Sequence, residues 1–223
     1  GERARLVFTG TYPASCGERS WSLAPLDHRQ YAESLVRELW RETGGTLGGT
    51  VRDGTVPPGA QLFSSHESPP LADQIRDINK WSNNVMARQL FLSLGAASGR
   101  APVREADGEA AIRTWLKSRD LSMPELVLEN GSGLSRRERI SAEGLGRLLL
   151  FAWASPTMPE FVSSMPVYGV DGTLKKRGNG NGNGGRAHLK GGTLDGVRCV
   201  AGYVLDRNGR RHAVAWLVNH ANA

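Results

Sequence analysis

Three small polar residues, Ser82, Asn83 and Asn84, interrupt two apolar patterns of helical period. The first pattern predicts a helix over 71–81, and the second predicts another helix from residue 85. Two interpretations are open here. Ser and Asn accept hydrogen bonds from the free N–H groups of a first helical turn, so the cluster could simply cap the second helix. Alternatively, Ser82 and Asn84 are fixed on rigid helices and line an active site.

A second cluster combines a lysine with two glycines and a threonine on a predicted strand. Lys190 and Gly192 share one face because side chains alternate along a strand. The missing β-carbon of Gly192 lets the backbone of a ligand lie close to that strand. Lys190 adds a positive charge, and Thr193 adds a hydroxyl and a backbone N–H. Together these groups suit a peptide-like ligand that ends in a carboxylate, but the same letters also fit a strand end followed by a turn.

The elements that must position these clusters change in type along the chain. Helices dominate the first two thirds, and an antiparallel run of strands follows, with a hairpin turn at "RNG" (207–209). This order predicts an α+β fold, an antiparallel sheet flanked by helices. The predicted helices are 28–45, 71–81, one from 85, 105–120, 142–153 and 157–165. The predicted strands are one within 4–17 that breaks into a loop at Pro13 and Gly17, and 61–64, 126–130, 186–190, 197–206 and 210–220.

Composition excludes several classes of protein. The 223 residues have a hydrophobic fraction of 39% and a net charge of +6, as in an ordinary globular protein with some affinity for anions. The basic residues are scattered and no nucleic-acid motif accompanies them, so nucleic-acid binding is not expected. No run of about 18 apolar residues occurs, so no transmembrane segment is expected.

Cysteine, histidine and glycine patterns predict no metal site and no cofactor. Cys16 and Cys199 are far apart in sequence, and their pairing stays open. The histidines have no ligand spacing. "RGNGNGNGGR" (177–186) contains a bare GxGxxG pattern, but a strand rather than a helix follows it, which excludes the dinucleotide-binding interpretation. This segment is a flexible loop or an engineered replacement for one.

The order Ser-x-Asn and then Lys-Gly-Gly-Thr resembles the penicillin-recognising serine enzymes, whose signature is S-x-x-K, then S-x-N, then K-T-G. Four segments extend the match over nearly the whole chain. They look closely like the D-alanyl-D-alanine carboxypeptidase/endopeptidase family, the class C low-molecular-weight penicillin-binding proteins of peptidase S13 type. The segments are "SSHESPPLADQIRDINKWSNNVMARQLF", "ENGSGLSRRERIS", "VYGVDGTLKKR" and "HLKGGTLDGVRCVAGYV".

The resemblance implies a role for each matching residue. Ser82 would belong to the proton relay around the nucleophile, and Asn84 would bind the peptide amide of the substrate. Lys190 would lie across the cleft from Ser82 and attract the terminal carboxylate. The hydroxyl of Thr193 would contact that carboxylate, and its backbone N–H would complete the oxyanion hole. Gly191 and Gly192 would form the rest of the substrate-binding strand.

This sequence departs from the family pattern at two points. Gly191 stands where the family usually has Thr or Ser, which removes one hydroxyl and predicts weakened binding. In addition, no serine is followed by a lysine three residues later, so the S-x-x-K element with the nucleophile is absent. We therefore expect the C-terminal portion of a longer enzyme, with 1–26 returning from inserted domains and 27–223 belonging to the penicillin-binding, transpeptidase-like domain.

The expected function follows from the resemblance. The full-length protein would be a serine D-alanyl-D-alanine carboxypeptidase that acts in the periplasm on peptidoglycan stem peptides and is acylated by penicillins. This chain alone would be inactive. "AVAWLV" (213–218) would be an unpaired sheet edge, so we expect association with the missing N-terminal portion or with a second copy. The alternative is a non-catalytic module that binds peptidoglycan peptides.

Overall fold

The structure is a computed structural model that describes residues 5–19, 21, 23–97, 99, 101–178 and 182–223. The chain divides into two compact units, Gly1–Ser65 and His66–Ala223. In the first unit, helix α1 (His28–Glu42) begins with a capping box. The Asp27 side chain accepts a hydrogen bond from the Gln30 N–H, and the Gln30 side chain accepts one from the Asp27 N–H.

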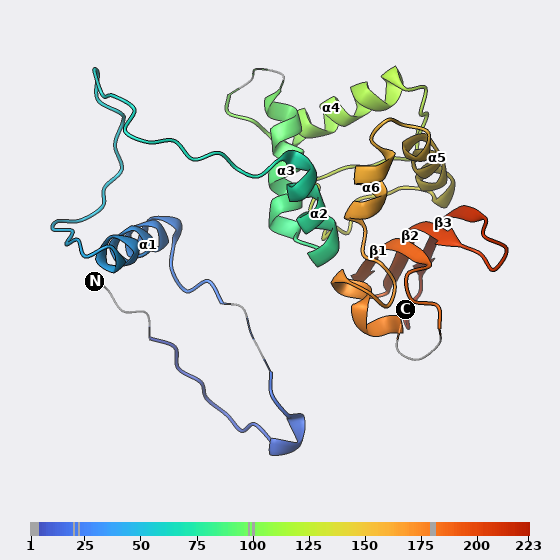
Figure 1. Ribbon diagram of the computed structural model, residues 1–223, viewed down its shortest axis with the longest axis horizontal. Coiled ribbons are helices and arrows are strands. Elements are labelled where there is room, and N and C mark those ends of the chain that lie inside the picture. Colours follow the sequence, from blue (N-terminus) through green and yellow to red (C-terminus); the bar gives the residue numbers. More distant parts are fainter. Residues whose placement is uncertain (1–4, 20, 22, 98, 100, 179–181) are drawn as a thin grey trace. The chain divides into compact units, whose positions relative to one another are not determined.

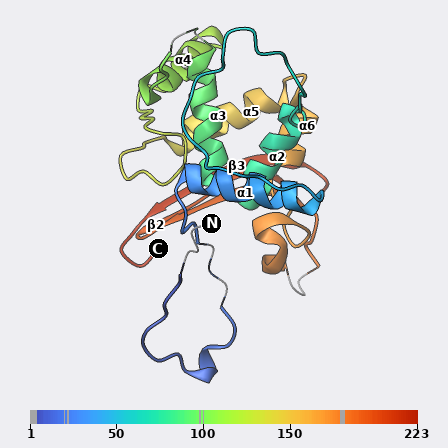
Figure 2. The same ribbon diagram turned by 90° about the vertical axis from the view of Figure 1, so that its left-hand side faces the viewer.

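The second unit contains helices and an antiparallel sheet, which confirms the predicted α+β class. The helices lie to one side of the sheet in both ribbon views (Figures 1 and 2). They are α2 (Leu71–Trp81), α3 (Asn84–Ala96), α4 (Glu105–Ser118), α5 (Ala142–Trp153) and α6 (Met158–Ser164); the short 3-10 helix η2 (Gly172–Gly178) is not part of this group. A 3-10 turn, η1 (Ala14–Cys16), belongs to the first unit.

The sheet has the strand order β1-β2-β3. The strands are β1 (Ala187–Leu194), β2 (Val197–Leu205) and β3 (Arg211–Asn219). Among the described residues β3 pairs with β2 alone, so it lies at one edge of the sheet as the sequence predicts. Its Trp216 side chain is exposed. The association of this edge with another polypeptide stays a prediction.

The core forms where α5 and α6 pack on the sheet. Leu149 of α5, Val162 of α6 and Tyr203 of β2 share one buried cluster. The Tyr203 hydroxyl donates a hydrogen bond of 2.6 Å to the Leu149 carbonyl, which satisfies the polar end of a buried aromatic ring. A second buried cluster lies under α4 and the following loop, around Leu116. The first cluster joins α5 and α6 to the sheet, and the second joins α4 and the loop after it to α5.

Three predicted strands are wrong. The described part of 4–17 contains only η1, and 61–64 has no regular structure. The segment 126–130 forms a single bridge, between Val127 and Arg139. Alternating apolar residues stabilise a strand only when a neighbouring strand accepts its hydrogen bonds, and the described residues of the first unit contain no strand.

Strand β1 is longer than predicted, because residues 191–194 continue the strand and pair with Val197–Val200. The turn is the dipeptide Asp195–Gly196, in which Gly196 has a φ of 70°, as tight hairpin turns require. The Lys-Gly-Gly-Thr letters thus lie in the last residues of β1, and the turn follows one residue after Thr193, as the strand-end interpretation also requires.

Four further predictions concern the domain boundary, the loop 177–186, membrane-spanning helices and the two cysteines. The predicted boundary between residues 26 and 27 stays a prediction. The predicted flexible loop 177–186 includes 179–181, which lie outside the described residues. None of the described helices is long and apolar enough to cross a membrane. Cys16 and Cys199 are both free thiols.

Two helical glycines provide a test of the packing between α3 and α4. A β-carbon on Gly108 would lie 2.6 Å from the Phe91 carbonyl oxygen, whereas one on Gly146 of α5 would meet nothing within 4 Å. We predict that Gly108→Ala lowers the free energy of unfolding by about 1–3 kcal/mol. Gly146→Ala should raise it by about 0.5–1 kcal/mol through helix propensity. Urea denaturation measures both, and equal effects of the two changes would contradict the close helix contact.

Candidate functional site

The Ser-Asn-Asn cluster divides its tasks between its three residues. Helix α2 ends at Ser82, which has φ 55° and ψ 47° and donates its backbone N–H to the Ile78 carbonyl. The side chain of Asn83 caps α3 by accepting a hydrogen bond of 3.0 Å from the Met86 N–H. The capping interpretation therefore holds for Asn83, while the side chains of Ser82 and Asn84 make other contacts.

The left-handed conformation of Ser82 is unusual for a residue with a β-carbon. It costs on the order of 1 kcal/mol or more, and it persists only where the surrounding structure imposes it. Here it lets the chain turn from α2 into α3 without a loop, so the Ser82 side chain projects from the junction of two packed helices. A group that is held in this way has little freedom to move.

The structure brings Ser82 and Lys190 together. The Lys190 ammonium donates a hydrogen bond of 2.8 Å to the Ser82 hydroxyl oxygen, although the two residues are 108 positions apart in the sequence. A second hydrogen bond of 3.0 Å goes from the same ammonium to the Gly191 carbonyl. No described carboxylate forms an ion pair with Lys190, and its burial lowers its pKa below the ordinary value of 10.5.

The side chain of Asn84 is held by the loop that contains Asn130 and Ser132. Its side-chain NH₂ donates a hydrogen bond of 2.6 Å to the Ser132 carbonyl. Ser132 is held in turn by Asn130, whose side-chain oxygen accepts hydrogen bonds from the Ser132 N–H and hydroxyl. The carbonyl oxygen of the Asn84 amide accepts no hydrogen bond from the described residues. This oxygen is therefore available to accept an N–H from a ligand.

These residues line one cleft with a volume of about 760 Å³. Every predicted site residue belongs to its wall: Ser82, Asn84, Lys190, Gly191, Gly192 and Thr193. Such a volume suits a small-molecule or peptide ligand. The structure thus places all six candidates around a single cavity, while their chemical roles stay predictions.

The edge of β1 beside the cleft has backbone groups without a strand partner. Leu189 and Tyr168 use the first half of this edge, through the bonds Leu189 N–H to Pro166 O and Tyr168 N–H to Ala187 O. Beyond Leu189, the residues 190–193 make backbone hydrogen bonds to no described segment other than β2. An extended peptide could add to this edge as a further strand.

Sequence reasoning missed several residues of the cleft wall. Thr173 and Arg177 come from η2, Leu134 follows the Ser132 turn, and Arg198 and Trp216 come from β2 and β3. The segments "GSGLS" and "VDGTL" contributed to the family resemblance, but no role was assigned to their residues. No group of three or more potential metal ligands occurs among the described residues.

Comparison with known proteins identifies the class and then the family. The structure is similar to penicillin-binding protein 4 (DacB) of Haemophilus influenzae, solved with a β-lactam, with a TM-score of 0.73 and 26% identity over 88% of this chain and 46% of that one. The fold is thus that of a penicillin-binding, transpeptidase-like domain. The chain belongs to the D-Ala-D-Ala carboxypeptidase 3 (S13) family, whose model matches residues 1–223.

Curated relatives agree with this assignment. A D-alanyl-D-alanine carboxypeptidase of Actinomadura sp. (strain R39) is 30% identical over 89% of this chain and 38% of its own length. The D-alanyl-D-alanine carboxypeptidase DacB of Haemophilus influenzae is 26% identical over 85% of this chain and 40% of its own length. The chain therefore spans about two fifths of the length of these relatives.

The titration of Lys190 gives a direct test of its environment. Because burial lowers its folded-state pKa, the unfolded chain binds more protons between that pKa and 10.5. Within this window the free energy of unfolding should rise with pH. We predict that carbon-13 NMR of labelled lysine shows Lys190 titrating below the other lysines, with Lys190→Arg used to assign its signal. A Lys190 signal that titrates at 10.5 or above would contradict the cleft environment described here.

Proposed function

We propose that residues 1–223 are the C-terminal portion of a serine D-alanyl-D-alanine carboxypeptidase, with residues 27–223 in its penicillin-binding domain. The substrate is a peptidoglycan stem peptide that ends in D-Ala-D-Ala, and β-lactams are acylating inhibitors of the same enzyme. The observation that carries the proposal is the hydrogen bond between Lys190 and Ser82 inside the cleft. A member of this family acts on the bacterial cell wall, so we place the protein in the periplasm.

The proposed reaction is acyl transfer to a serine that lies outside this chain. That serine attacks the peptide carbonyl and releases the terminal D-alanine, and water then hydrolyses the acyl-enzyme. Ser82 passes a proton between the nucleophile and the leaving amine, and Lys190 holds the Ser82 hydroxyl by donating to its oxygen. This chain supplies two walls of the cleft, so residues 1–223 by themselves do not catalyse the reaction.

The substrate lies along β1. Its C-terminal carboxylate is attracted by Lys190 and contacts the Thr193 hydroxyl, while the Thr193 N–H contributes to the oxyanion hole. The Asn84 carbonyl oxygen accepts the N–H of the substrate peptide, and Gly192 leaves room for the substrate backbone. The free edge of β1 and the open Asn84 oxygen support this orientation.

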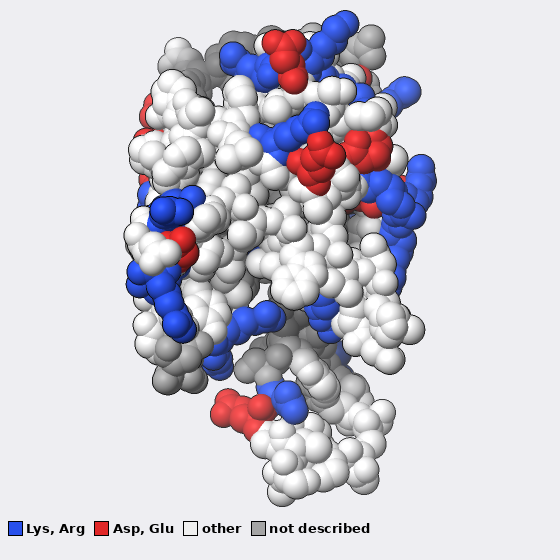
Figure 3. All heavy atoms as spheres, turned by 90° about the vertical axis from the view of Figure 1, so that its right-hand side faces the viewer, with Lys and Arg blue, Asp and Glu red and all other residues white. Residues whose placement is uncertain are grey.

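A non-catalytic module that binds peptidoglycan peptides is the alternative. The same cleft and the same β1 edge would serve it, and the absence of S-x-x-K from this chain is compatible with it. On the face shown in Figure 3, Lys and Arg are interspersed with Asp and Glu, so this face does not favour nucleic-acid binding. A nucleic-acid site needs a continuous basic surface.

Labelling with a fluorescent penicillin distinguishes catalysis from binding alone. The full-length protein should become covalently labelled, and residues 1–223 alone should not. In the full-length protein, Lys190→Ala and Ser82→Ala should each lower the acylation rate by about a hundredfold or more, because each removes a group of the proton relay. Rates are measured by gel fluorescence against time.

Asn83→Ala is the matched control for Ser82→Ala. It removes the α3 cap and should cost about 1 kcal/mol of stability, but it should leave acylation unchanged. Full-length wild-type protein that never takes label would favour the binding module. If Lys190→Ala is labelled as fast as the wild type, Lys190 has no role in acylation. If Ser82→Ala lowers only the melting temperature, Ser82 has a structural role alone.

A substitution at Gly191 is expected to raise the rate of acylation rather than lower it. A β-carbon at this position would have only the Cys199 carbonyl oxygen nearby, at 3.9 Å, so a larger side chain fits. Gly191→Thr in the full-length protein should raise the second-order rate of penicillin acylation severalfold, because it restores a hydroxyl near the carboxylate. Gly191→Ala is the control for side-chain volume. An equal effect of Ala and Thr would show that the hydroxyl is not responsible.

A further inference from the structure

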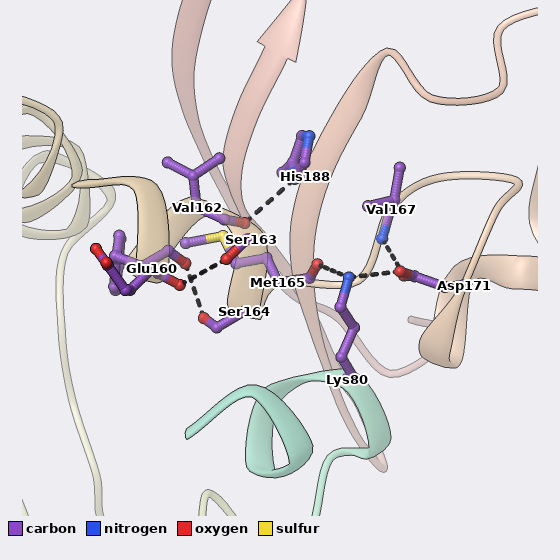
Figure 4. A network of polar contacts seen from close by, with 10 residues as sticks. Lys80, Glu160, Val162, Ser163, Ser164, Met165, Val167, Asp171 and His188 are labelled. Atoms are coloured by element: carbon purple, nitrogen blue, oxygen red, sulfur yellow. Dashed lines mark hydrogen bonds and ion pairs between the residues drawn. The ribbon is translucent and has the colours of Figure 1, made fainter. Parts of the chain in front are cut away.

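A buried lysine joins the end of α2 to the segment before η2. Lys80, with 9% of its surface exposed, donates one hydrogen bond of 2.7 Å to the Met165 carbonyl and one of 2.6 Å to a carboxylate oxygen of Asp171. The other carboxylate oxygen of Asp171 accepts the Val167 N–H at 2.7 Å. Figure 4 shows Lys80 extending from α2 between these two acceptors.

The carboxylate of Asp171 is ionised in this arrangement. Its partial burial opposes ionisation, but the hydrogen bonds from Lys80 and from the Val167 N–H, together with the charge of Lys80, outweigh burial and lower its pKa. The charge of Lys80 is thus neutralised in place, in contrast to that of Lys190 in the cleft. Asp171 also ties the loop 167–171 to the same ammonium.

The main chain makes a second connection at the same point. Gly172 has a φ of 55°, and a β-carbon on it would lie 2.6 Å from the Lys80 carbonyl oxygen. Residue 172 therefore packs directly on the last turn of α2. One residue earlier in α2, the Asn79 side chain donates a hydrogen bond of 2.8 Å to the buried Ser164 hydroxyl.

These contacts lie next to the cleft on both sides. Ser82 follows Lys80 by two residues, and Thr173 of the cleft wall follows Gly172 directly. Any change in the spacing between Lys80 and residues 171–172 thus moves Ser82 relative to η2. A buried ion pair is a weak source of stability, because desolvation offsets its attraction. Its fixed geometry, in contrast, constrains both connected segments.

We infer that Lys80, Asp171 and Gly172 form a positioning clamp that holds Ser82 in place for its contact with Lys190. None of the three touches the substrate, and each acts through the backbone that it fixes. The inference rests on the proposed function in so far as Ser82 serves in acylation. It adds that the activity of the cleft depends on a charge pair outside it.

Two independent changes in the full-length protein test the clamp. Lys80→Met/Asp171→Asn removes both charges together, so neither is left unpaired, and the asparagine oxygen can still accept the Val167 N–H. Gly172→Ala keeps the charges and pushes the two backbones apart. In both variants the acylation rate constant for penicillin should fall at least tenfold, while the dissociation constant of the non-covalent complex changes less than threefold.

Two glycine variants separate positioning from stability. Gly209→Ala introduces the same kind of strain as Gly172→Ala, since Gly209 has a φ of 78°, but its β-carbon would meet nothing within 4 Å. Gly108→Ala lowers stability far from the clamp. Both should retain wild-type acylation at temperatures where they are folded. If acylation follows the melting temperature across all four variants, the clamp stabilises the fold only and the inference is wrong.

A second readout does not depend on acylation. In the clamp variants, the Ser82 side of the cleft should move away from Lys190 and admit water, so the Lys190 pKa measured by NMR should rise toward 10.5. An unchanged Lys190 titration in a folded clamp variant overturns the inference, whether or not penicillin labels the wild type. Absence of label on the wild type contradicts the proposed function alone.

Discussion

The hydrogen bond between Lys190 and Ser82 is the interaction on which the cleft depends, because it joins the helical layer to the sheet at the site itself. Ser82 belongs to the α2–α3 junction and Lys190 to β1, and the contact of 2.8 Å requires both elements to be correctly placed. The core cluster around Tyr203 fixes β2 against α5 and α6, and β1 takes its position from its register with β2. The positions of Ser82 and Lys190 therefore depend on the packing of the core between the helices and the sheet.

The three polar residues between α2 and α3 both cap a helix and place two side chains at the cleft. Asn83 supplies the cap, and this leaves the side chains on either side free of that task. The left-handed backbone at Ser82 is costly, and a continuous helix would avoid the cost. Such a helix would also turn Ser82 and Asn84 to different directions, about 200° apart, since successive residues differ by about 100°. The strained junction is what places both on one cleft.

The sequence predicted what depends on local pattern and on motif order. The helices 71–81 and 142–153, the terminal strands and six of the residues in the cleft wall follow from periodicity or from the family resemblance. The clamp of Lys80 and Asp171 could not be predicted, because 91 positions separate its partners and no spacing rule joins them. The false strand at 4–17 has the converse cause: alternation is local, but a strand requires a partner that local sequence does not reveal.

Lys80 and Lys190 lie in the same region of the molecule, but only the positive charge of Lys80 is paired with a carboxylate. Lys80 is buried against a carboxylate and a carbonyl, so its charge is matched and its position fixed. Lys190 is half-buried with only a hydroxyl and a carbonyl as partners among the described residues. A cation left without a counter-ion costs stability, and proteins tolerate such costs mainly where they serve a function. The proposed function accounts for the unmatched charge of Lys190 by an anionic group of the substrate, and the proposed clamp accounts for the matched charge of Lys80.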